Sequence, residues 1–379
     1  MPSHHDLLRL SPVEQNRAVG KLLSLKHFLD DVPLHDGGFR PDGVPTRTLD
    51  KSLLVATWNL REFGANKSYG PRLPESLHYI AEIISAFDLV AIQEVRSQVD
   101  DFKRLMQILG EHWGFLLTDI TLGKSGNDER GAFIYDRRKV HFEGFAGQVL
   151  LPPELKVGKK KLQLKQQLAR TPLVAGFRAG DFRFTVCSAH IYYGKKLPNE
   201  KRRVDEIEAL ATILSERVRS ESAWAPTTVL LGDFNIFELK DETAERLRTA
   251  GFYLPPQVAS LEAGETRKKY DQIALLSPRY DKQTKAIAKK ARGGVIRFFD
   301  KLFIDDGEEW KVYRQYFPNQ RAAETEESGR KYFRAWRTYQ LSDHRPRWIE
   351  LKADFGVERL AAMRHRLAKG QTAERESSV

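Results

Sequence analysis

The segment Leu53-Leu54-Val55-Ala56-Thr57-Trp58-Asn59-Leu60-Arg61 is an apolar run that ends in polar residues. A short run of this kind, rich in branched and aromatic side chains, predicts a buried β-strand. Four other segments repeat the arrangement of polar residues at the end of an expected strand. They are Gln93-Glu94-Val95-Arg96, Ser188-Ala189-His190, Gly232-Asp233-Phe234-Asn235 and Ser342-Asp343-His344. Because loops gather where strands end, we expect the five segments to form one site.

Short apolar runs and helical patterns alternate irregularly along the rest of the chain. Further strand-like runs are Leu89 to Gln93, Phe133 to Tyr135, Leu173 to Phe177, Phe182 to Ser188, Val229 to Leu231 and Arg347 to Leu351. Helical spacing is clearest at Asp101 to Leu109, Lys201 to Val218 and Thr243 to Ala250. The turn Ala179-Gly180-Asp181 fits a tight hairpin. Hairpins mixed with helices favour packed sheets with flanking helices over a regular strand-helix alternation.

Composition and charge narrow the class of protein. The chain has 379 residues, 41% of them hydrophobic, which is enough for a sizeable core. Lysine and arginine number 62 against 51 acidic residues, so the net charge of +11 favours polyanionic partners. The single cysteine, Cys187, cannot form an internal disulfide, and Met1 to Leu10 lacks the apolar stretch of a signal peptide. No apolar run reaches the length of a membrane span, so we expect a cytoplasmic protein without stable membrane insertion.

The polar residues of the five segments indicate metal-assisted hydrolysis of a phosphate ester. Five of them are oxygen donors, and no thiolate accompanies them: Asn59, Glu94, Asp233, Asn235 and Asp343. Such a set suits Mg²⁺ or Mn²⁺ better than Zn²⁺. His190 and His344 supply proton transfer near neutral pH, and a metal would neutralise charge that develops on phosphoryl oxygens.

Taken in order, the segments resemble the endonuclease/exonuclease/phosphatase superfamily, and in detail its deoxyribonuclease I-like branch. The resemblance extends from about Leu53 to Leu351. Further matching motifs are Ala56 to Gly64, Asp128-Glu129-Arg130, Ala169-Arg170-Thr171-Pro172 and Tyr270-Asp271-Gln272-Ile273. The resemblance implies an α/β fold, a four-layer sandwich of two mostly antiparallel sheets packed face to face with outer helices.

The resemblance also implies roles for individual residues. Glu94 matches the principal metal ligand, with Asn59 and Asp343 as further ligands. His190 matches a catalytic histidine oriented by Glu129. His344 matches a second one, oriented by Asp271. Asp233 would position or deprotonate the attacking water, and Asn235 would hold a phosphate oxygen. Arg96 and Arg170 match arginines that grip a nucleic-acid backbone.

The chain divides into three expected parts. Residues 1–50 form a helical extension and linker, 51–355 the catalytic domain with a basic insertion at about 278–337, and 356–379 a short helix and polar tail. In the extension, the capping box Ser11-Pro12-Val13-Glu14 begins a helix. Its expected apolar face contains Val19, Leu22, Leu23 and Leu29. The stretch Asp36 to Asp50 has the glycine and proline content of a linker.

The residues that a superfamily shares do not determine which substrate an individual member hydrolyses. Three basic clusters favour nucleic acid, and we expect DNA in preference to RNA: Lys156 to Lys165, Lys195 to Arg203, and Lys282 to Arg297. Tyr192 and Tyr193 could stack on bases beside His190. Lysine runs are also often only solvated, and basic surfaces bind anionic membranes. The alternatives are a phosphoinositide or sphingomyelin phosphoesterase, and a nucleic-acid-binding member without catalysis.

Overall fold

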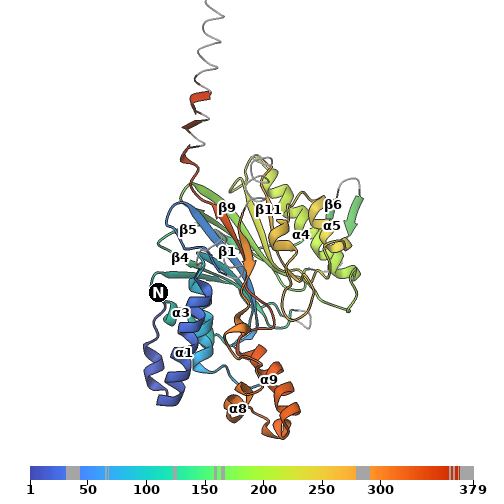
Figure 1. Ribbon diagram of the computed structural model, residues 1–379. Helices are drawn as coiled ribbons and strands as arrows, with labels where there is room; N and C mark the ends of the chain where they lie inside the picture. Colours follow the sequence, from blue (N-terminus) through green and yellow to red (C-terminus); the bar gives the residue numbers. More distant parts are fainter. Residues whose placement is uncertain are drawn as a thin grey trace, which may run out of the picture.

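The computed structural model contains two β-sheets with helices on both outer sides (Figure 1). It describes residues 1–30, 43–64, 66, 68–122, 126–157, 160–163, 167–278, 291–357, 360–361, 363–365 and 367. Most of the basic stretch that begins the insertion lies outside the described residues. So does the end of the polar tail from residue 368.

The first sheet has six strands in the order β12-β13-β1-β2-β4-β3. Their bounds are Gly293–Val295 for β12, Arg347–Lys352 for β13, Ser52–Phe63 for β1, Leu89–Val95 for β2, Arg130–Asp136 for β4 and Trp113–Leu117 for β3. Only β1 and β2 pair in parallel within this sheet, and the other neighbours are antiparallel. The polar ends of β1 and β2 therefore lie side by side.

The second sheet has five strands in the order β11-β10-β9-β8-β5. Their bounds are Asp271–Leu276 for β11, Thr228–Asp233 for β10, Phe182–His190 for β9, Leu173–Ala179 for β8 and Val140–Gln148 for β5. Again one central pair, β9 with β10, is parallel and the rest are antiparallel. The expected hairpin joins β8 to β9 through Gly180, whose φ is +55°. A separate hairpin consists of β6 (Glu154–Val157) and β7 (Lys160–Gln163).

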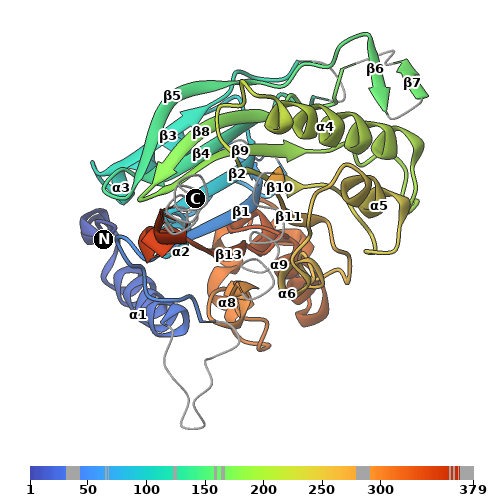
Figure 2. The same ribbon diagram turned by 90° about the horizontal axis from the view of Figure 1, so that it is seen from above.

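The two sheets pack face to face, and helices cover their outer faces. Alternate residues of β1 point in opposite directions: Leu53 and Val55 enter the core between the sheets, whereas Leu54 and Ala56 pack under helices. Strands that are buried on both faces have continuous apolar sequences, which explains why the strands appear as apolar runs without alternating polar residues. In Figure 2, α4 (Lys201–Arg219) lies on one side of the paired sheets, while α1 (Pro12–Leu29) and α2 (Pro74–Ser85) lie on the other. The predicted four-layer α/β sandwich is confirmed.

Two of the remaining helices lie in the same two outer layers. Helix α3 (Asp100–Leu109) buries Phe102 and Leu105 in the layer that contains α2, and α5 (Glu242–Thr249) packs with α4. The short helix α6 (Pro256–Ala259) lies near β11 and β12. None of the helices in the described part of the chain combines the length and apolar character that crossing a bilayer requires.

The N-terminal extension is built into the core beside α2. After a 3₁₀ turn, η1 (His5–Arg9), Ser11 caps the start of helix α1 and forms the predicted capping box with Glu14. Its buried residues are Ala18, Leu22, Leu25 and Leu29. The expected apolar face was therefore partly wrong, because Val19 is 46% exposed and Leu23 54% exposed. The true buried face follows spacings of four, three and four residues, and Val19 and Leu23 lie beside it.

The described part of the insertion is a folded layer, although the sequence predicts little more than its charge. Strand β12 extends the first sheet and is followed by the 3₁₀ turn η3 (Phe298–Asp300) and helix α8 (Glu309–Tyr313). The 3₁₀ turns η4 (Arg314–Tyr316) and η5 (Gln320–Ala323) then lead to helix α9 (Glu326–Gln340). Aromatic side chains tie this layer to the main core: Trp310, Tyr313, Phe317, Phe333 and Trp336. Figure 1 shows α8 and α9 near α1, at one end of the sandwich.

Candidate active site

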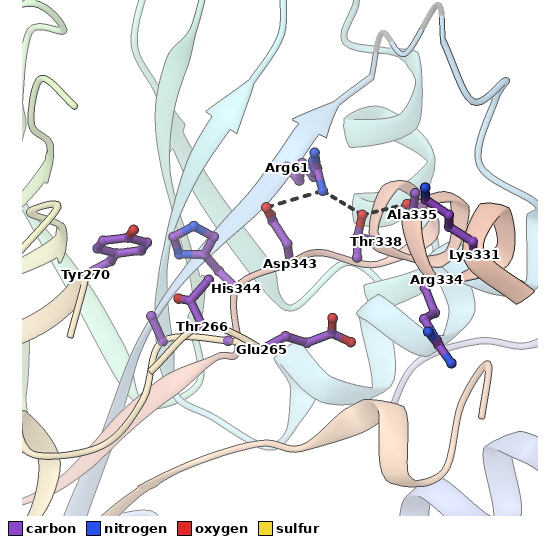
Figure 3. A pocket seen from close by; sticks show the side chains of 12 residues that line it. Arg61, Glu265, Thr266, Tyr270, Lys331, Arg334, Ala335, Thr338, Asp343 and His344 are labelled. Carbon is purple, nitrogen blue, oxygen red and sulfur yellow. Dashed lines mark hydrogen bonds and ion pairs between the residues drawn. The ribbon is translucent and has the colours of Figure 1, made fainter. Parts of the chain in front are cut away.

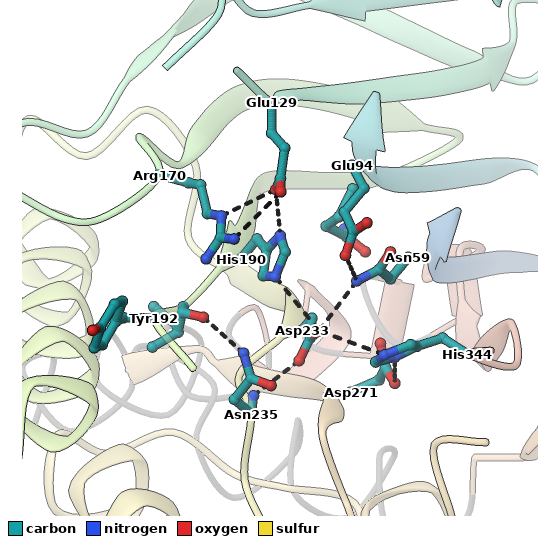
Figure 4. Close-up of polar contacts among 12 residues, drawn as sticks. Asn59, Glu94, Glu129, Arg170, His190, Tyr192, Asp233, Asn235, Asp271 and His344 are labelled. Carbon is teal, nitrogen blue, oxygen red and sulfur yellow. Dashed lines mark hydrogen bonds and ion pairs between the residues drawn. The ribbon is translucent and has the colours of Figure 1, made fainter. Parts of the chain in front are cut away.

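The strand ends of both sheets meet at one place and carry the predicted residues to it (Figure 4). Asn59 follows the apolar part of β1, and Glu94 lies near the end of β2. In the second sheet, the register places Asp233 between His190 and Asp271 on its neighbouring strands. Gln93, the residue before Glu94 on β2, donates from Nε2 to Ser188 Oγ on β9 at 2.9 Å and so links the two sheets. The sandwich therefore brings polar residues of both sheets to a common edge.

Glu94 is partly buried and is held in place by hydrogen bonds. It has a φ of +63°, at a point where the pairing of β2 with both neighbouring strands shifts register. Asn59 Nδ2 donates to Glu94 Oε1 at 2.8 Å, and the Glu62 amide donates to Oε2 at 2.9 Å. Burial and the nearby Glu129 charge raise the pKa of Glu94. A carboxylate destabilised in this way gains from any cation placed next to it.

The first histidine pairs with Glu129, as the sequence predicts. His190 Nδ1 lies 2.9 Å from Glu129 Oε2. Arg170 Nε donates to the same Glu129 oxygen at 3.0 Å, and Asn127 Nδ2 donates to Oε1 at 2.6 Å. Burial alone would raise the pKa of Glu129, but His190 and Arg170 outweigh it and lower the pKa to about 2. Glu129 is therefore ionised at any working pH and fixes the orientation of the imidazole.

The second histidine pairs with Asp271. His344 Nδ1 lies 2.8 Å from Asp271 Oδ2, in hydrogen-bond geometry. Burial alone would lower the pKa of His344, but Asp271 and Asp233 outweigh it and raise the pKa well above its usual value. The ring also stacks on Tyr270, with the centroids 6.0 Å apart. Gly264 packs against the backbone of Asp343 so closely that a side chain would not fit, since a Cβ there would lie 1.9 Å from the Asp343 carbonyl oxygen.

Both imidazoles converge on Asp233. Its Oδ2 lies 3.7 Å from His190 Nε2 and 3.8 Å from His344 Nε2. Asn59 Nδ2 donates to the same oxygen at 3.2 Å. Asn235, with a φ of +54°, donates its backbone amide to Asp233 Oδ1 at 2.9 Å. Non-glycine residues in the left-handed region cluster at functional sites, and Glu94 and Asn235 both fit that pattern.

The donor set fits a hard divalent cation. Glu94 is partly buried, and Asn59 Oδ1 has no hydrogen-bond partner among the described residues. A carboxylate and an unpaired amide oxygen side by side are ligands that Mg²⁺ and Mn²⁺ accept. Asp343, the third predicted ligand, is 42% exposed and pairs with Arg61 at 3.2 Å. Two other groups could hold a metal by proximity, Glu94 with Glu129 and His190, and Asp233 with Asp271 and His344. In each of those groups a carboxylate already engages the histidine Nδ1.

The predicted substrate-binding residues lie in different surroundings. Arg170 pairs with Glu129. Arg96 Nη1 donates to the Asn127 carbonyl oxygen and lies 3.8 Å from Glu129 Oε1. The Tyr192 ring lies under the Arg202 guanidinium, 4.2 Å from centroid to Cζ, and Figure 4 shows it directed away from both histidines. Both arginines thus border the site, whereas Tyr192 does not face it.

The expected basic cluster from Lys195 to Arg203 needs a correction. Arg203 is fully buried and donates to the carbonyl oxygens of Tyr192, Lys195 and Leu197 at 3.0 to 3.2 Å. It therefore fixes the loop that follows His190 and cannot reach a phosphate. A sequence pattern cannot distinguish such a buried arginine from a surface one, because both occur in charged runs.

Sequence reasoning assigned no role to Arg61, Tyr270, Asn127 and the whole of α9. Arg61 ends the segment that begins at Leu53, and it contacts Asp343 beside the site. Thr338 Oγ1 accepts from Arg61 Nη1 at 2.6 Å, and Tyr339 OH accepts from Nη2 at 3.0 Å. An arginine two residues after Asn59 was the available signal, but these partners are 277 and 278 residues away in sequence.

Comparison with known proteins gives results for solved structures only, since no family model and no curated protein matches the chain. An endonuclease/exonuclease/phosphatase family protein from Bacteroides thetaiotaomicron is 18% identical, with a TM-score of 0.49, covering 80% of this chain and 96% of its own. A mannosyl-6-phosphatase from the same species is 18% identical, with a TM-score of 0.48 and coverages of 79% and 99%. Truncated TDP2 from Caenorhabditis elegans is 12% identical, with a TM-score of 0.47 and coverages of 80% and 98%.

Endonuclease/exonuclease/phosphatase proteins are thus among the solved structures to which this chain is similar. Identities below 20% and TM-scores below 0.5 do not extend that similarity to a substrate or a mechanism. The chemistry of the site follows from its own geometry: two carboxylate-oriented imidazoles, one shared aspartate and a partly buried glutamate.

Proposed function

We propose that this chain is a metal-dependent phosphodiesterase that cleaves nucleic acid, with DNA preferred to RNA. The observation that carries the proposal is the convergence of two imidazoles on Asp233, at 3.7 and 3.8 Å, with Glu94 linked to the same aspartate through Asn59. Two oriented proton-transfer groups beside a hard-oxygen metal site match the needs of phosphodiester hydrolysis.

Each residue then has a distinct task. Glu94 and Asn59, with Asp343 as a third candidate, would hold Mg²⁺ or Mn²⁺, and the ion would supply charge neutralisation at the phosphoryl oxygens. Asp233 would orient the attacking water, because its carboxylate lies between the two imidazoles. His190 and His344 would donate hydrogen bonds from Nε2 to the phosphoryl oxygens, since Glu129 and Asp271 occupy their Nδ1 sides. Asn235 retains one amide hydrogen for a phosphate oxygen, because the other is donated to the Ile191 carbonyl at 2.8 Å.

Charge supports nucleic acid as the substrate. The chain carries a net charge of +11, and Arg96 and Arg170 border the site beside Glu129. A positive protein attracts polyanions at long range and binds them with strong salt dependence. The expected clusters Lys156 to Lys165 and Lys282 to Arg297 lie largely outside the described side chains, so this support comes from the sequence alone.

The deciding experiment is nicking of supercoiled plasmid by the full chain with Mg²⁺ or Mn²⁺, against EDTA. We expect nicking that needs the metal and is lost in Glu94→Gln. The matched control is Glu245→Gln, an exposed glutamate on α5, which should nick at the wild-type rate. Absence of metal-dependent cleavage of DNA and RNA would overturn the proposal. Release of phosphate or headgroup from phosphoinositide or sphingomyelin vesicles would then favour the lipid esterase. Salt-sensitive binding without any product would favour a non-catalytic role.

A further inference from the structure

A cavity of about 370 Å³ opens directly beside His344 and Asp343 (Figure 3). Its size falls within the range of roughly 300–1,000 Å³ that is usual for ligand pockets. Three parts of the chain form its walls: Arg61 from β1, the loop around Gly264 and Glu265, and helix α9 of the insertion. The residues that it shares with the site are His344, Asp343, Arg61, Gly264 and Tyr270. The cavity is therefore an extension of the site toward the insertion.

One face of α9 forms the wall opposite His344. The α9 residues that line the cavity are Lys331, Arg334, Ala335 and Thr338. They are separated by three, one and three positions in the sequence. Such spacing places them on one side of a helix. The other side of α9 is anchored in the core by Phe333 and Trp336, which are fully buried. A helix anchored in the core thus places two cations, Lys331 and Arg334, in the cavity wall, and Figure 3 shows the Arg334 guanidinium directed away from His344.

The cavity has more cationic than anionic groups to offer a ligand. Glu265 is already neutralised by Arg337, which lies outside the cavity lining, through a 2.5 Å ion pair. Arg61 is held by Asp343 and Thr338, and Arg334 by Asp305. Lys331 is exposed, with no ion-pair partner in the part of the chain that the structure describes. An anionic ligand would gain charge-assisted hydrogen bonds from Lys331 and Arg334.

We propose that this cavity binds a second phosphate group of the substrate, next to the one that is hydrolysed. This inference rests on the proposed function, because it assumes that the scissile phosphate lies at His344. His344 and Asp343 line the cavity, so a phosphate bound in it would lie next to the scissile phosphate. Along a nucleic-acid strand phosphates recur every few ångströms, about 3.4 Å of helix axis per strand. The second phosphate comes from the backbone of a longer strand or from a strand end.

The test compares substrates with one and with two phosphates, using Lys331→Gln/Arg334→Gln in the full chain. The control is Lys311→Gln/Arg321→Gln, which removes the same charge from exposed positions of the insertion outside the cavity. Bis(4-nitrophenyl) phosphate and a dinucleotide are the substrates with one phosphate. The same dinucleotide with a terminal phosphate and a 12-nucleotide strand have at least two and are called two-phosphate substrates here. We expect kcat/KM of the cavity variant to fall about tenfold on two-phosphate substrates, mainly through KM, and to stay within about twofold on one-phosphate substrates.

The two-phosphate substrates also distinguish the source of the second phosphate. A loss confined to the end-phosphorylated dinucleotide assigns the cavity to a strand end, and a loss confined to the 12-mer assigns it to the backbone. Equal losses on one- and two-phosphate substrates, or equal losses in the cavity and control variants, would overturn the inference. Because Arg334 also pairs with Asp305, the single change Lys331→Glu repeats the comparison without disturbing that ion pair.

A binding measurement separates failure of this inference from failure of the proposed function. The 12-mer is titrated with salt in the presence of EDTA, where no turnover occurs. We expect the slope of log affinity against log salt to become less steep by about 0.7 for each phosphate that the cavity variant no longer binds. If the wild type cleaves nothing but the slope changes, the proposed function fails and the phosphate site stands. Slopes equal to that of the control variant overturn the phosphate site.

Discussion

At the scale of single residues, the site is defined by what each histidine touches on its two nitrogens. Nδ1 of each imidazole is occupied by an acidic partner, Glu129 or Asp271, and Nε2 is left facing Asp233. This arrangement fixes the tautomer and keeps both rings protonated to a higher pH, because the neighbouring carboxylates raise their pKa values against the effect of burial. The sequence predicted both pairings through the family resemblance, but the convergence on Asp233 is a property of the folded chain.

The substitution Asp271→Asn tests the orienting role directly. It keeps an oxygen that can accept from His344 Nδ1 but removes the charge that raises the histidine pKa. We expect kcat to fall by about tenfold or more, with little change in KM. Because the raised pKa keeps His344 protonated to higher pH, the alkaline limb of the kcat profile should move to lower pH in the variant. The profile and the NMR titration of His344 check this, with Asp354→Asn as an exposed control. An unchanged alkaline limb would contradict the role.

At the scale of elements, the extension is attached by polar contacts as well as by apolar packing. His4 meets His78 of α2 with their Nδ1 atoms 2.9 Å apart, and Glu82 accepts from Lys26 of α1 at 2.5 Å. Arg47, expected in a linker, pairs with the buried Asp88 at 2.7 Å. These partners lie 41 to 74 residues apart, so local sequence patterns could not predict them.

The contact between His4 and His78 makes the stability of the protein sensitive to pH. Burial lowers the pKa of His78 to about 4, with the nearby His4 and Arg104 acting in the same direction. An unfolded histidine titrates near 6.5, so the unfolded state binds more protons between about pH 4 and 6.5. The free energy of unfolding should therefore decrease as the pH falls through that window, by about 2–3 kcal/mol from this residue.

The variant His78→Gln removes the titrating group and should flatten the pH dependence over the same window. Urea unfolding at several pH values between about 4 and 7.5 measures it. His141→Gln, an exposed histidine on β5, is the matched control and should retain the wild-type slope. Parallel curves for wild type and His78→Gln would show that another group governs the acid sensitivity.

At the scale of the whole molecule, one apolar core joins the extension, the first sheet and the insertion. Leu25 of α1, Trp58 of β1 and Trp336 of α9 are fully buried members of the same cluster. The sequence-based division at residue 50 therefore marks a change of composition, and the residues on its two sides share a core. We expect these parts to unfold together.

Leu25→Ala tests that cooperativity from one end of the core. A buried leucine truncated to alanine costs about 2–5 kcal/mol of unfolding free energy. Tryptophan fluorescence and far-UV circular dichroism should both shift, with coincident denaturant midpoints. Leu23→Ala, on the same helix but 54% exposed, should change the unfolding free energy by no more than about 0.5 kcal/mol. Two separate transitions in Leu25→Ala would show that the extension unfolds on its own.

The sequence by itself determined the strands that carry the site and the residue types at their ends. Apolar runs such as Leu53 to Trp58 mark strands buried on both faces, and each polar end carries the chemistry of its own side chains. The family resemblance supplied the sandwich and the pairing of each histidine with its carboxylate. These features are local patterns, or an ordered series of them, and need no knowledge of distant contacts.

Only the tertiary structure decided which charged residues are available to a substrate. Arg203 lies in a basic run but is buried under the loop after His190, while Lys331 and Arg334 face the cavity beside His344. Arg61 and Thr338 are 277 residues apart in sequence and in hydrogen-bond contact. Burial and pairing depend on which elements pack together, and hydrophobic periodicity fixes the face of a helix without naming its neighbour. The insertion therefore became part of the site only when α9 was placed against β1.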